Sequence, residues 1–188
     1  RMELMLDGNC RLSESDAHTI ASALDELNWA WFEEPMPLDP NTYAQLNTSV
    51  DIPITGGETF SRAEQFDPYL EANAFKIAQP DIGVCGVSEW LRIVKRANEY
   101  GVDLCPHSWH NGLLGTAHAH LIAALPRPRV LELCMVQGPL QWGILRKTPV
   151  IEHGHLVLPN EPGWGVEISD DLERRFPYVD GDYAVPLD

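Results

Sequence analysis

Six ionisable residues follow short apolar segments of the chain, at intervals of 23 to 26 residues. The first three are the carboxylates Asp7, Glu33 and Glu58. Carboxylates that are brought together repel one another, which raises their pKa values unless a cation lies between them. An all-oxygen set of ligands, without a thiol or an adjacent imidazole, suits a hard ion. These residues therefore predict a site for Mg²⁺, with Mn²⁺ as the second choice. Ordinary solvated loop acids are the alternative.

The other three residues of this series are Asp81, His107 and Glu132. A carboxylate beside an imidazole fixes the tautomer of the ring and raises its basicity. We therefore predict an Asp81–His107 pair in which His107 is a general base. A protonated Glu132 can donate a hydrogen bond to a developing enolate oxygen. The alternatives are a structural histidine for His107 and a buried ion-pair partner for Glu132.

Three neighbours of this series are predicted to bind the substrate. Trp109 and His110 follow the predicted base by two and three positions, and Asn9 follows Asp7 by two positions. We expect their side chains at the substrate pocket, with simple loop packing as the alternative.

Other acidic and imidazole groups are not assigned to the site. Glu34 neighbours Glu33, but successive side chains of a strand point to opposite faces. His118 and His120 lie two positions apart in an apolar helical stretch. Residues at that spacing point to different sides of a helix, so we expect no joint metal site there.

The elements that position these groups alternate along the chain. Each of the six residues ends a β-prone segment, and these segments are 2–7, 29–33, 52–58, 74–81, 102–107 and 129–132. The stretches between them show helix signals, which include serine-led capping boxes at 13–16 and 61–64, a stripe formed by Trp90, Leu91, Val94 and Ala97, and an apolar run at 112–125. The signal at 40–50 is the weakest.

Alternating strands and helices predict an α/β fold of parallel strands with right-handed crossovers. Two architectures remain, an open doubly wound sheet and a β/α barrel. In an open sheet the ligand chemistry gathers at one switch point, so that two or three strand ends carry it. A barrel brings the carboxyl ends of all its strands around one mouth. Because all six predicted strands end in an ionisable group, we favour the barrel.

The composition of the chain argues against two classes of binding partner. The 188 residues include 28 acidic and 13 basic side chains, which gives a formal net charge of −15. This balance argues against binding to nucleic acid or to an anionic membrane, because both need clustered Lys and Arg. No apolar run approaches the length of a membrane span. The four scattered cysteines predict reduced thiols in an intracellular protein, which we expect in the cytoplasm; they are Cys10, Cys85, Cys105 and Cys134.

Several short sequence motifs, taken together, resemble those of one known family. The chain is similar to the C-terminal barrel part of enolase-superfamily enzymes of the mandelate racemase/muconate lactonizing enzyme subgroup. The order and spacing of these motifs agree with those of the family over nearly the whole chain. They are Leu6-Asp7-Gly8-Asn9, Trp31-Phe32-Glu33-Glu34-Pro35, Gly56-Gly57-Glu58, Gln79-Pro80-Asp81, Pro106-His107 and Leu131-Glu132.

This resemblance implies a (β/α)7β barrel of which the chain supplies strands three to eight. It implies Mg²⁺ held by Asp7, Glu33 and Glu58 at the ends of strands three, four and five. It also implies that residues 1–139 belong to the barrel and that residues 140–188 return toward an N-terminal capping domain. That domain and the first two strands are absent from these residues, so we expect the chain to be part of a longer one.

The resemblance also implies the chemistry. The metal binds the carboxylate of a small hydroxy acid, and His107, paired with Asp81, removes the α-proton to give an enediolate that Glu132 steadies. The leading prediction is dehydration of an acid sugar to a 2-keto-3-deoxy acid, because the dyad shows no second base of a racemase. A racemase or epimerase, a lactone cycloisomerase, a non-catalytic metal-binding barrel and a metal hydrolase barrel are the alternatives. Relatives often form symmetric assemblies, so a homo-oligomer is expected.

Overall fold

A single parallel sheet organises the first two thirds of the chain. The structure is a computed structural model that describes residues 2–136 and 138–181. The five strands of this sheet lie side by side in the order in which they occur in the sequence, and all five are parallel. They are β1 (Met5–Asp7), β2 (Trp31–Glu33), β3 (Ile54–Gly56), β4 (Ile77–Ala78) and β5 (Asp103–Leu104). This confirms the predicted α/β class with a parallel sheet.

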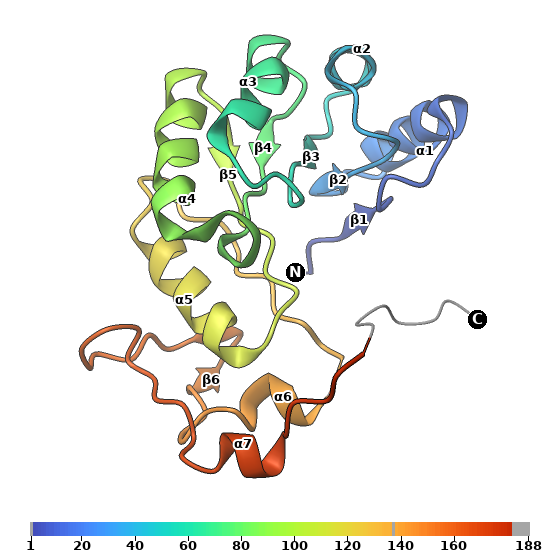
Figure 1. Ribbon diagram of the computed structural model, residues 1–188. Helices are drawn as coiled ribbons and strands as arrows, with labels where there is room; N and C mark the ends of the chain where they lie inside the picture. Colours follow the sequence, from blue (N-terminus) through green and yellow to red (C-terminus); the bar gives the residue numbers. More distant parts are fainter. Residues whose placement is uncertain (1, 137, 182–188) are drawn as a thin grey trace.

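Helices connect the strands and cover one face of the sheet (Figure 1). They are α1 (Glu14–Glu26), α2 (Pro40–Ser49), α3 (Ala63–Glu71) and α4 (Ile82–Glu99), and α5 (Gly112–Ala123) follows the last strand. The helix with the weakest sequence signal, α2, does form, because the Asp39 carboxylate caps it and Pro40 occupies its first turn. Consecutive strands are neighbours without a reversal of direction, so the sheet winds as one arc, as in a barrel and unlike a doubly wound sheet.

The two faces of the sheet bury different side chains. Phe32 and Ile54 point toward the helices and join the large core between helices and sheet. On the opposite face, Trp31, Ile77 and Cys105 form a smaller apolar cluster. Because side chains alternate along a strand, Glu33 lies on the same face as Trp31. The predicted ligands of β1 and β2 therefore sit on the concave side, away from the helices.

The predicted sixth strand at 129–132 is wrong, because the described residues between α5 and 136 contain no strand. The segment nevertheless runs beside β5, since the Cys105 thiol donates to the Val130 carbonyl oxygen at 3.4 Å. Pro126 and Pro128 precede it and lack the N–H groups that a strand ladder uses. In the described residues the parallel sheet thus has five strands where six were expected.

Details of two helices also differ from the predictions. The expected capping box from Ser61 to Glu64 is shifted by one residue, because the Gln65 side chain accepts from the backbone N–H of Arg62 at 3.0 Å. In α4, Leu91 is exposed, and the buried stripe contains Ile93 in its place. Gly86 interrupts this helix with a φ of 74°, a conformation that glycine adopts without steric cost.

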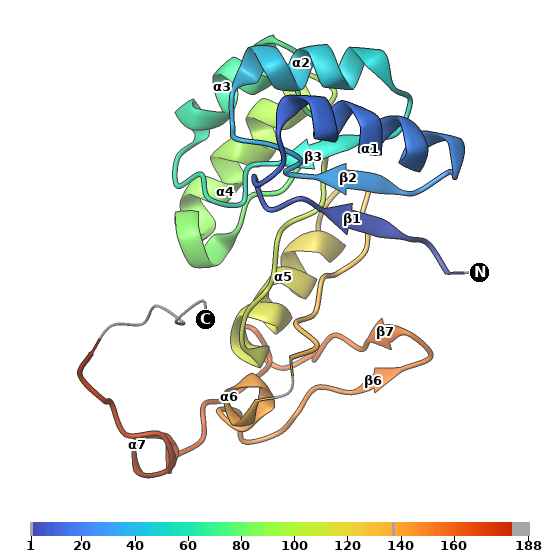
Figure 2. The same ribbon diagram turned by 90° about the vertical axis from the view of Figure 1, so that its right-hand side faces the viewer.

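The last part of the chain lies below the sheet as a loosely structured tail (Figure 2). It contains α6 (Pro139–Trp142), a hairpin of β6 (Ile151–Glu152) with β7 (His155–Leu156), and α7 (Leu172–Arg175). The division at residue 140 into barrel and returning segment stays a prediction. The four cysteines form no disulfide. Among the described residues, no helix combines the length and hydropathy that crossing a membrane requires.

Candidate active site

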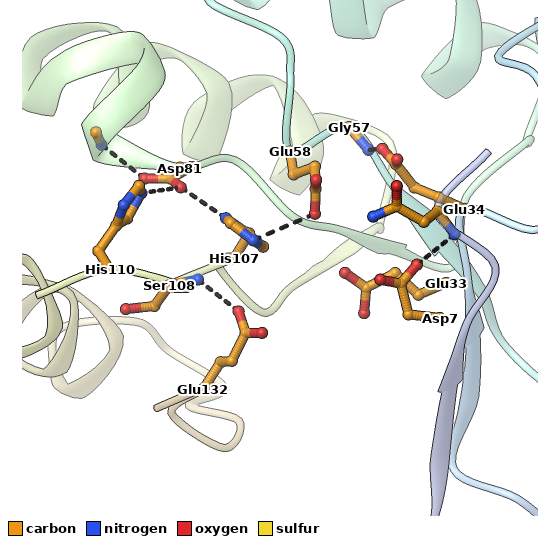
Figure 3. A network of polar contacts seen from close by, with 12 residues as sticks. Asp7, Glu33, Glu34, Gly57, Glu58, Asp81, His107, Ser108, His110 and Glu132 are labelled. Carbon is orange, nitrogen blue, oxygen red and sulfur yellow. Dashed lines mark hydrogen bonds and ion pairs between the residues drawn. The ribbon is translucent and has the colours of Figure 1, made fainter. Parts of the chain in front are cut away.

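Three carboxylates gather at the carboxyl ends of the first three strands (Figure 3). Asp7 ends β1 and Glu33 ends β2, and the strand register places these two residues opposite each other. Glu58 follows the end of β3 by two positions. Asp7 is exposed, whereas Glu33 and Glu58 are half-buried. The indole N–H of Trp31 donates to Glu33 Oε2 at 3.1 Å and orients that carboxylate.

These carboxylates influence one another electrostatically. Burial, together with the negative charges of Asp7 and Glu132, raises the pKa of Glu33 to about 7, although a hydrogen bond with Gln79 acts in the opposite direction. Burial also raises the pKa of Glu58 to about 7; His107 lowers it, while Glu34 and Asp7 raise it. Among the described residues, no Lys or Arg forms an ion pair with Asp7, Glu33 or Glu58. Within this part of the chain, His107 is the basic side chain that contacts the cluster, through Glu58.

Asp81 and His107 form the expected pair. His107 Nδ1 lies 2.7 Å from Asp81 Oδ2, and its other ring nitrogen, Nε2, lies 3.4 Å from Glu58 Oε2. Burial disfavours the charged ring, but the hydrogen bond to Asp81 and the charges of Glu58 and Glu132 outweigh it and raise the pKa of His107 to about 9. The hydrogen bond at Nδ1 thus directs Nε2 toward the carboxylate cluster.

The fold holds Asp81 in one orientation. It caps the N-terminus of α4, and its fully buried side chain accepts the backbone N–H of Gly83 at 2.6 Å through Oδ1. Its Oδ2 also contacts His110 Nε2 at 2.6 Å. Burial opposes ionisation, but the hydrogen bonds from His107 and His110 hold the pKa of Asp81 well below its usual range.

The donor atoms of Asp81, His107 and His110 lie within 4.8 Å of one another, a spacing that a metal ion could also bridge. Both nitrogen–oxygen separations, 2.7 and 2.6 Å, are normal hydrogen-bond lengths. We therefore interpret this group as a hydrogen-bonded network centred on Asp81.

Glu132 completes the arrangement from the segment beside β5. The backbone N–H of Ser108 donates to its Oε2 at 2.6 Å, which leaves Oε1 for another partner. A cavity of about 260 Å³ separates Glu132 from Asp7 and Glu33, and Gln79 also lines it. A larger hollow of about 700 Å³ lies within the tail, at residues 146–150, 157–162 and 165–167, and none of the residues predicted to carry the chemistry lines it.

The predicted substrate-binding residues lie in different settings. Asn9 is exposed, and its backbone N–H donates to Asp7 Oδ1 at 2.7 Å. Trp109 is 49% exposed. His110 contacts Asp81, as described above, so its side chain supports the dyad in addition to any contact with a substrate. Their binding of a substrate stays a prediction.

Two residues that the sequence analysis set aside lie close to the site. Glu34 is only 3% exposed, and its Oε1 accepts the backbone N–H of Gly57 at 3.2 Å. Its φ of 34° breaks the strand alternation on which the prediction rested. His118 is fully buried, and its Nε2 lies 3.5 Å from Asp81 Oδ1. Neither position has a sequence signal that marks it, because both depend on contacts between distant segments.

A comparison with known protein families identifies the family of the chain. A family described as enolase C-terminal domain-like matches residues 1–172. The chain belongs to this family.

Several curated relatives of the chain are named as enzymes of sugar acids or their lactones. The chain is 31% identical to D-galactarolactone cycloisomerase of Agrobacterium fabrum, with 95% of this chain and 50% of that protein covered. Other curated relatives, 28–30% identical, are dehydratases of sugar acids. The chain spans about half the length of the curated relatives that it matches.

Solved enolase-type structures agree with this picture. The 3,6-anhydro-D-galactonate cycloisomerase of Zobellia galactanivorans is 33% identical, with a TM-score of 0.87 over 93% of this chain and 50% of that one. The L-talarate dehydratase of Polaromonas, solved with Mg and L-glucarate, is 26% identical, with a TM-score of 0.81 over 92% of this chain and 46% of that one.

Proposed function

We propose that this chain is part of an enzyme that dehydrates a sugar acid to a 2-keto-3-deoxy acid. The reaction begins with removal of the proton α to the substrate carboxylate. The observation that carries the proposal is the 2.7 Å hydrogen bond between Asp81 and His107, which directs His107 Nε2 toward the carboxylate cluster. The dehydratases among the relatives support the substrate class. We also propose that the five observed strands belong to a (β/α)7β barrel.

Asp7, Glu33 and Glu58 would hold a divalent cation, Mg²⁺ in the first place. Their donor set is all oxygen, which suits a hard cation, and in the described part of the chain no Lys or Arg balances the repulsion among the three carboxylates. The residues therefore fit the ion. When bound, Mg²⁺ supplies positive charge that stabilises the negative charge developing on a substrate carboxylate.

His107 supplies the base in the proposed reaction. In its deprotonated form the ring accepts the α-proton at Nε2, and Asp81, through the hydrogen bond at Nδ1, stabilises the imidazolium that results. The same nitrogen then returns this proton to the β-hydroxyl group, which leaves as water. The resulting enol tautomerises to the 2-keto acid. One proton is thus taken from carbon and delivered to the leaving oxygen, and the net change is the loss of one water molecule.

Glu132 is proposed to act on the oxygen side of the substrate. The Ser108 N–H holds Glu132 Oε2, so that its Oε1 can face the cavity shared with Asp7 and Glu33. With a proton on that oxygen, Glu132 donates a hydrogen bond to the enolic oxygen as negative charge develops there. Removal of such a donor costs about 10²–10³ in kcat.

The test incubates the complete protein and Mg²⁺ with a panel of aldonic and aldaric acids and measures 2-keto acid formation. His107→Asn should lower kcat by about 10²–10⁴-fold while the circular dichroism spectrum is unchanged. His155→Asn is the matched control, because it exchanges an exposed histidine of the tail. If His107→Asn turns over at the wild-type rate, the assignment of the base is wrong.

Cycloisomerisation of a sugar-acid lactone is a second candidate. Both D-galactarolactone cycloisomerase and 3,6-anhydro-D-galactonate cycloisomerase exceed 30% identity to this chain. The same residues would remove the α-proton, but the product would be a rearranged isomer and no water would be lost. Product mass separates the two reactions, because dehydration lowers the mass and isomerisation leaves it unchanged. Deuterium exchange at the α-carbon without either product would indicate a racemase or epimerase.

A further inference from the structure

Glu34 is a buried carboxylate without a basic partner. Its side chain is among the most enclosed acidic groups of the protein, at 3% exposure, and no Lys, Arg or His in the part of the chain that the structure describes forms an ion pair with it. Burial of an unpaired charge is costly, so such groups are normally paired or lie near a metal ion. Glu34 directly follows Glu33, one of the three proposed cation ligands.

The contacts of Glu34 join the loops that carry all three proposed ligands. Its carbonyl oxygen accepts the backbone N–H of Cys10 at 2.7 Å, in the loop that follows Asp7. Its Oε1 accepts the backbone N–H of Gly57 at 3.2 Å, immediately before Glu58 (Figure 3). A single residue therefore connects the ends of β1, β2 and β3.

The second carboxylate oxygen is also occupied. The Cys10 thiol lies 3.0 Å from Glu34 Oε2. Burial and the adjacent carboxylate raise the pKa of Cys10 to about 12, so that the sulfur keeps its proton and donates it to this oxygen. Both oxygens of Glu34 thus accept hydrogen bonds from the loops on either side, which fixes the side chain between them.

The backbone of Glu34 is strained in a way that favours this arrangement. Its φ of 34° lies in the left-handed region, which residues other than glycine seldom adopt. Such a conformation is energetically unfavourable and persists only where the surroundings fix it. Here it turns the side chain away from the strand alternation and into the space between the loops after β1 and β3.

We infer that Glu34 is a positioning residue for the divalent cation: its carboxylate ties the loop before Glu58 to the loop after Asp7 and so sets the distances among the three ligands. The inference deepens the proposed function, because it rests on the cation site assigned there. It predicts that the reach of the side chain to the Gly57 N–H matters more than its charge. Gln at position 34 keeps that reach, whereas Asp keeps the charge and loses the reach.

The experiment titrates the metal-free complete protein with Mn²⁺, follows free Mn²⁺ by electron paramagnetic resonance, and repeats the titration with Mg²⁺ by calorimetry. Glu34→Leu and Glu34→Asp should weaken binding by about tenfold to a hundredfold, the usual effect of losing a group that orients metal ligands. Glu34→Gln should bind within about threefold of the wild type. If the Leu variant does not fold, the comparison of Asp with Gln decides.

Glu89→Leu is the matched control for a general loss of stability. Glu89 Oε1 also accepts a backbone N–H from another element, that of Ala63 at 2.7 Å, but it joins α4 to α3 outside the carboxylate cluster. This variant should lower the melting temperature of the metal-free protein and leave the Mn²⁺ affinity unchanged. A purely structural role for Glu34 would give the same result as Glu89→Leu.

The possible outcomes separate this inference from the proposed function. Wild-type Mn²⁺ affinity in Glu34→Asp and Glu34→Leu overturns the inference, and so does a Gln variant that binds as weakly as the Leu variant. A wild-type protein that binds neither ion overturns the cation site and the inference together. Normal binding without turnover of any sugar acid contradicts only the proposed reaction, because the readout here is cation affinity.

Discussion

The buried imidazole of His118 should make the protein lose stability in weak acid. Its side chain is fully enclosed, its Nδ1 lies 3.1 Å from the Leu114 carbonyl oxygen, and its Nε2 lies 3.1 Å from the backbone N–H of Ile82. With Nδ1–H as the donor, Nε2 is an acceptor, so the geometry requires one neutral tautomer. A proton on Nε2 would displace the Ile82 hydrogen bond and bury a charge.

The size of this effect follows from the pKa of His118. Burial lowers it from 6.5 to about 4, although Asp81 acts in the opposite direction. Between these two pH values the unfolded chain binds a proton that the folded chain does not bind, so acidification favours unfolding. The contribution of neutral His118 to the free energy of unfolding is fully present above pH 6.5 and is lost as the pH falls to about 4. At about 1.4 kcal/mol per pH unit, the loss amounts to about 3 kcal/mol.

Urea unfolding between pH 7 and pH 4, in buffer without divalent cations, tests this prediction. His118→Gln cannot take up a proton, and its amide oxygen can accept the Ile82 N–H. The wild type should therefore lose about 3 kcal/mol more than the variant over this range. Groups such as Glu33 titrate in both proteins, so their effect cancels. His155→Gln exchanges an exposed histidine and controls for removal of an imidazole as such. If wild type and His118→Gln lose equal stability, the buried neutral tautomer is wrong.

Three further perturbations have definite expected outcomes. Mg²⁺ at one hundred times its Kd should raise the free energy of unfolding by about 2.7 kcal/mol, and Glu58→Gln should remove most of this gain; an equal gain in both proteins would exclude the assigned site. His110→Leu removes one hydrogen bond from Asp81 Oδ2 and should lower kcat about tenfold or more with little change in KM. His110→Gln should restore kcat. A variant in which KM rises and kcat is unchanged would instead indicate that His110 contacts the substrate. Asp25→Ala leaves the N–H of Ile52 without the carboxylate that it contacts at 2.8 Å, and urea unfolding should show a loss of about 1–3 kcal/mol, which Asp25→Asn should reduce.

The periodic pattern of the sequence was sufficient to predict the parallel α/β fold. Apolar strand segments that each end in an ionisable group recur at nearly constant spacing, and this repeat requires one strand and one helix per unit. Parallel strands with their carboxyl ends at one edge then bring Asp7 and Glu33 together, as the register shows. The prediction was wrong at 129–132, where local apolar character suggested a strand that the flanking prolines do not support.

The sequence also indicated which residue types could form the site, but it could not show how the side chains are oriented. That Asp81 pairs with His107 was predictable, because both residues follow the ends of neighbouring strands. That His110 shares the same carboxylate oxygen depends on the path of the loop after β5. The shift of the cap on α3 likewise depends on which side chain reaches the free N–H groups.

Sequence alone thus determined the order of strands and helices and the identity of the groups at the strand ends, because both follow from periodicity along one chain. Tertiary structure alone decided the roles of Glu34 and His118. Each is buried by contacts with segments more than twenty residues away, namely Gly57 with Glu34 and Ile82 with His118. Burial and hydrogen bonding across that separation set the charge and the orientation of a side chain, and no local pattern of residues encodes them.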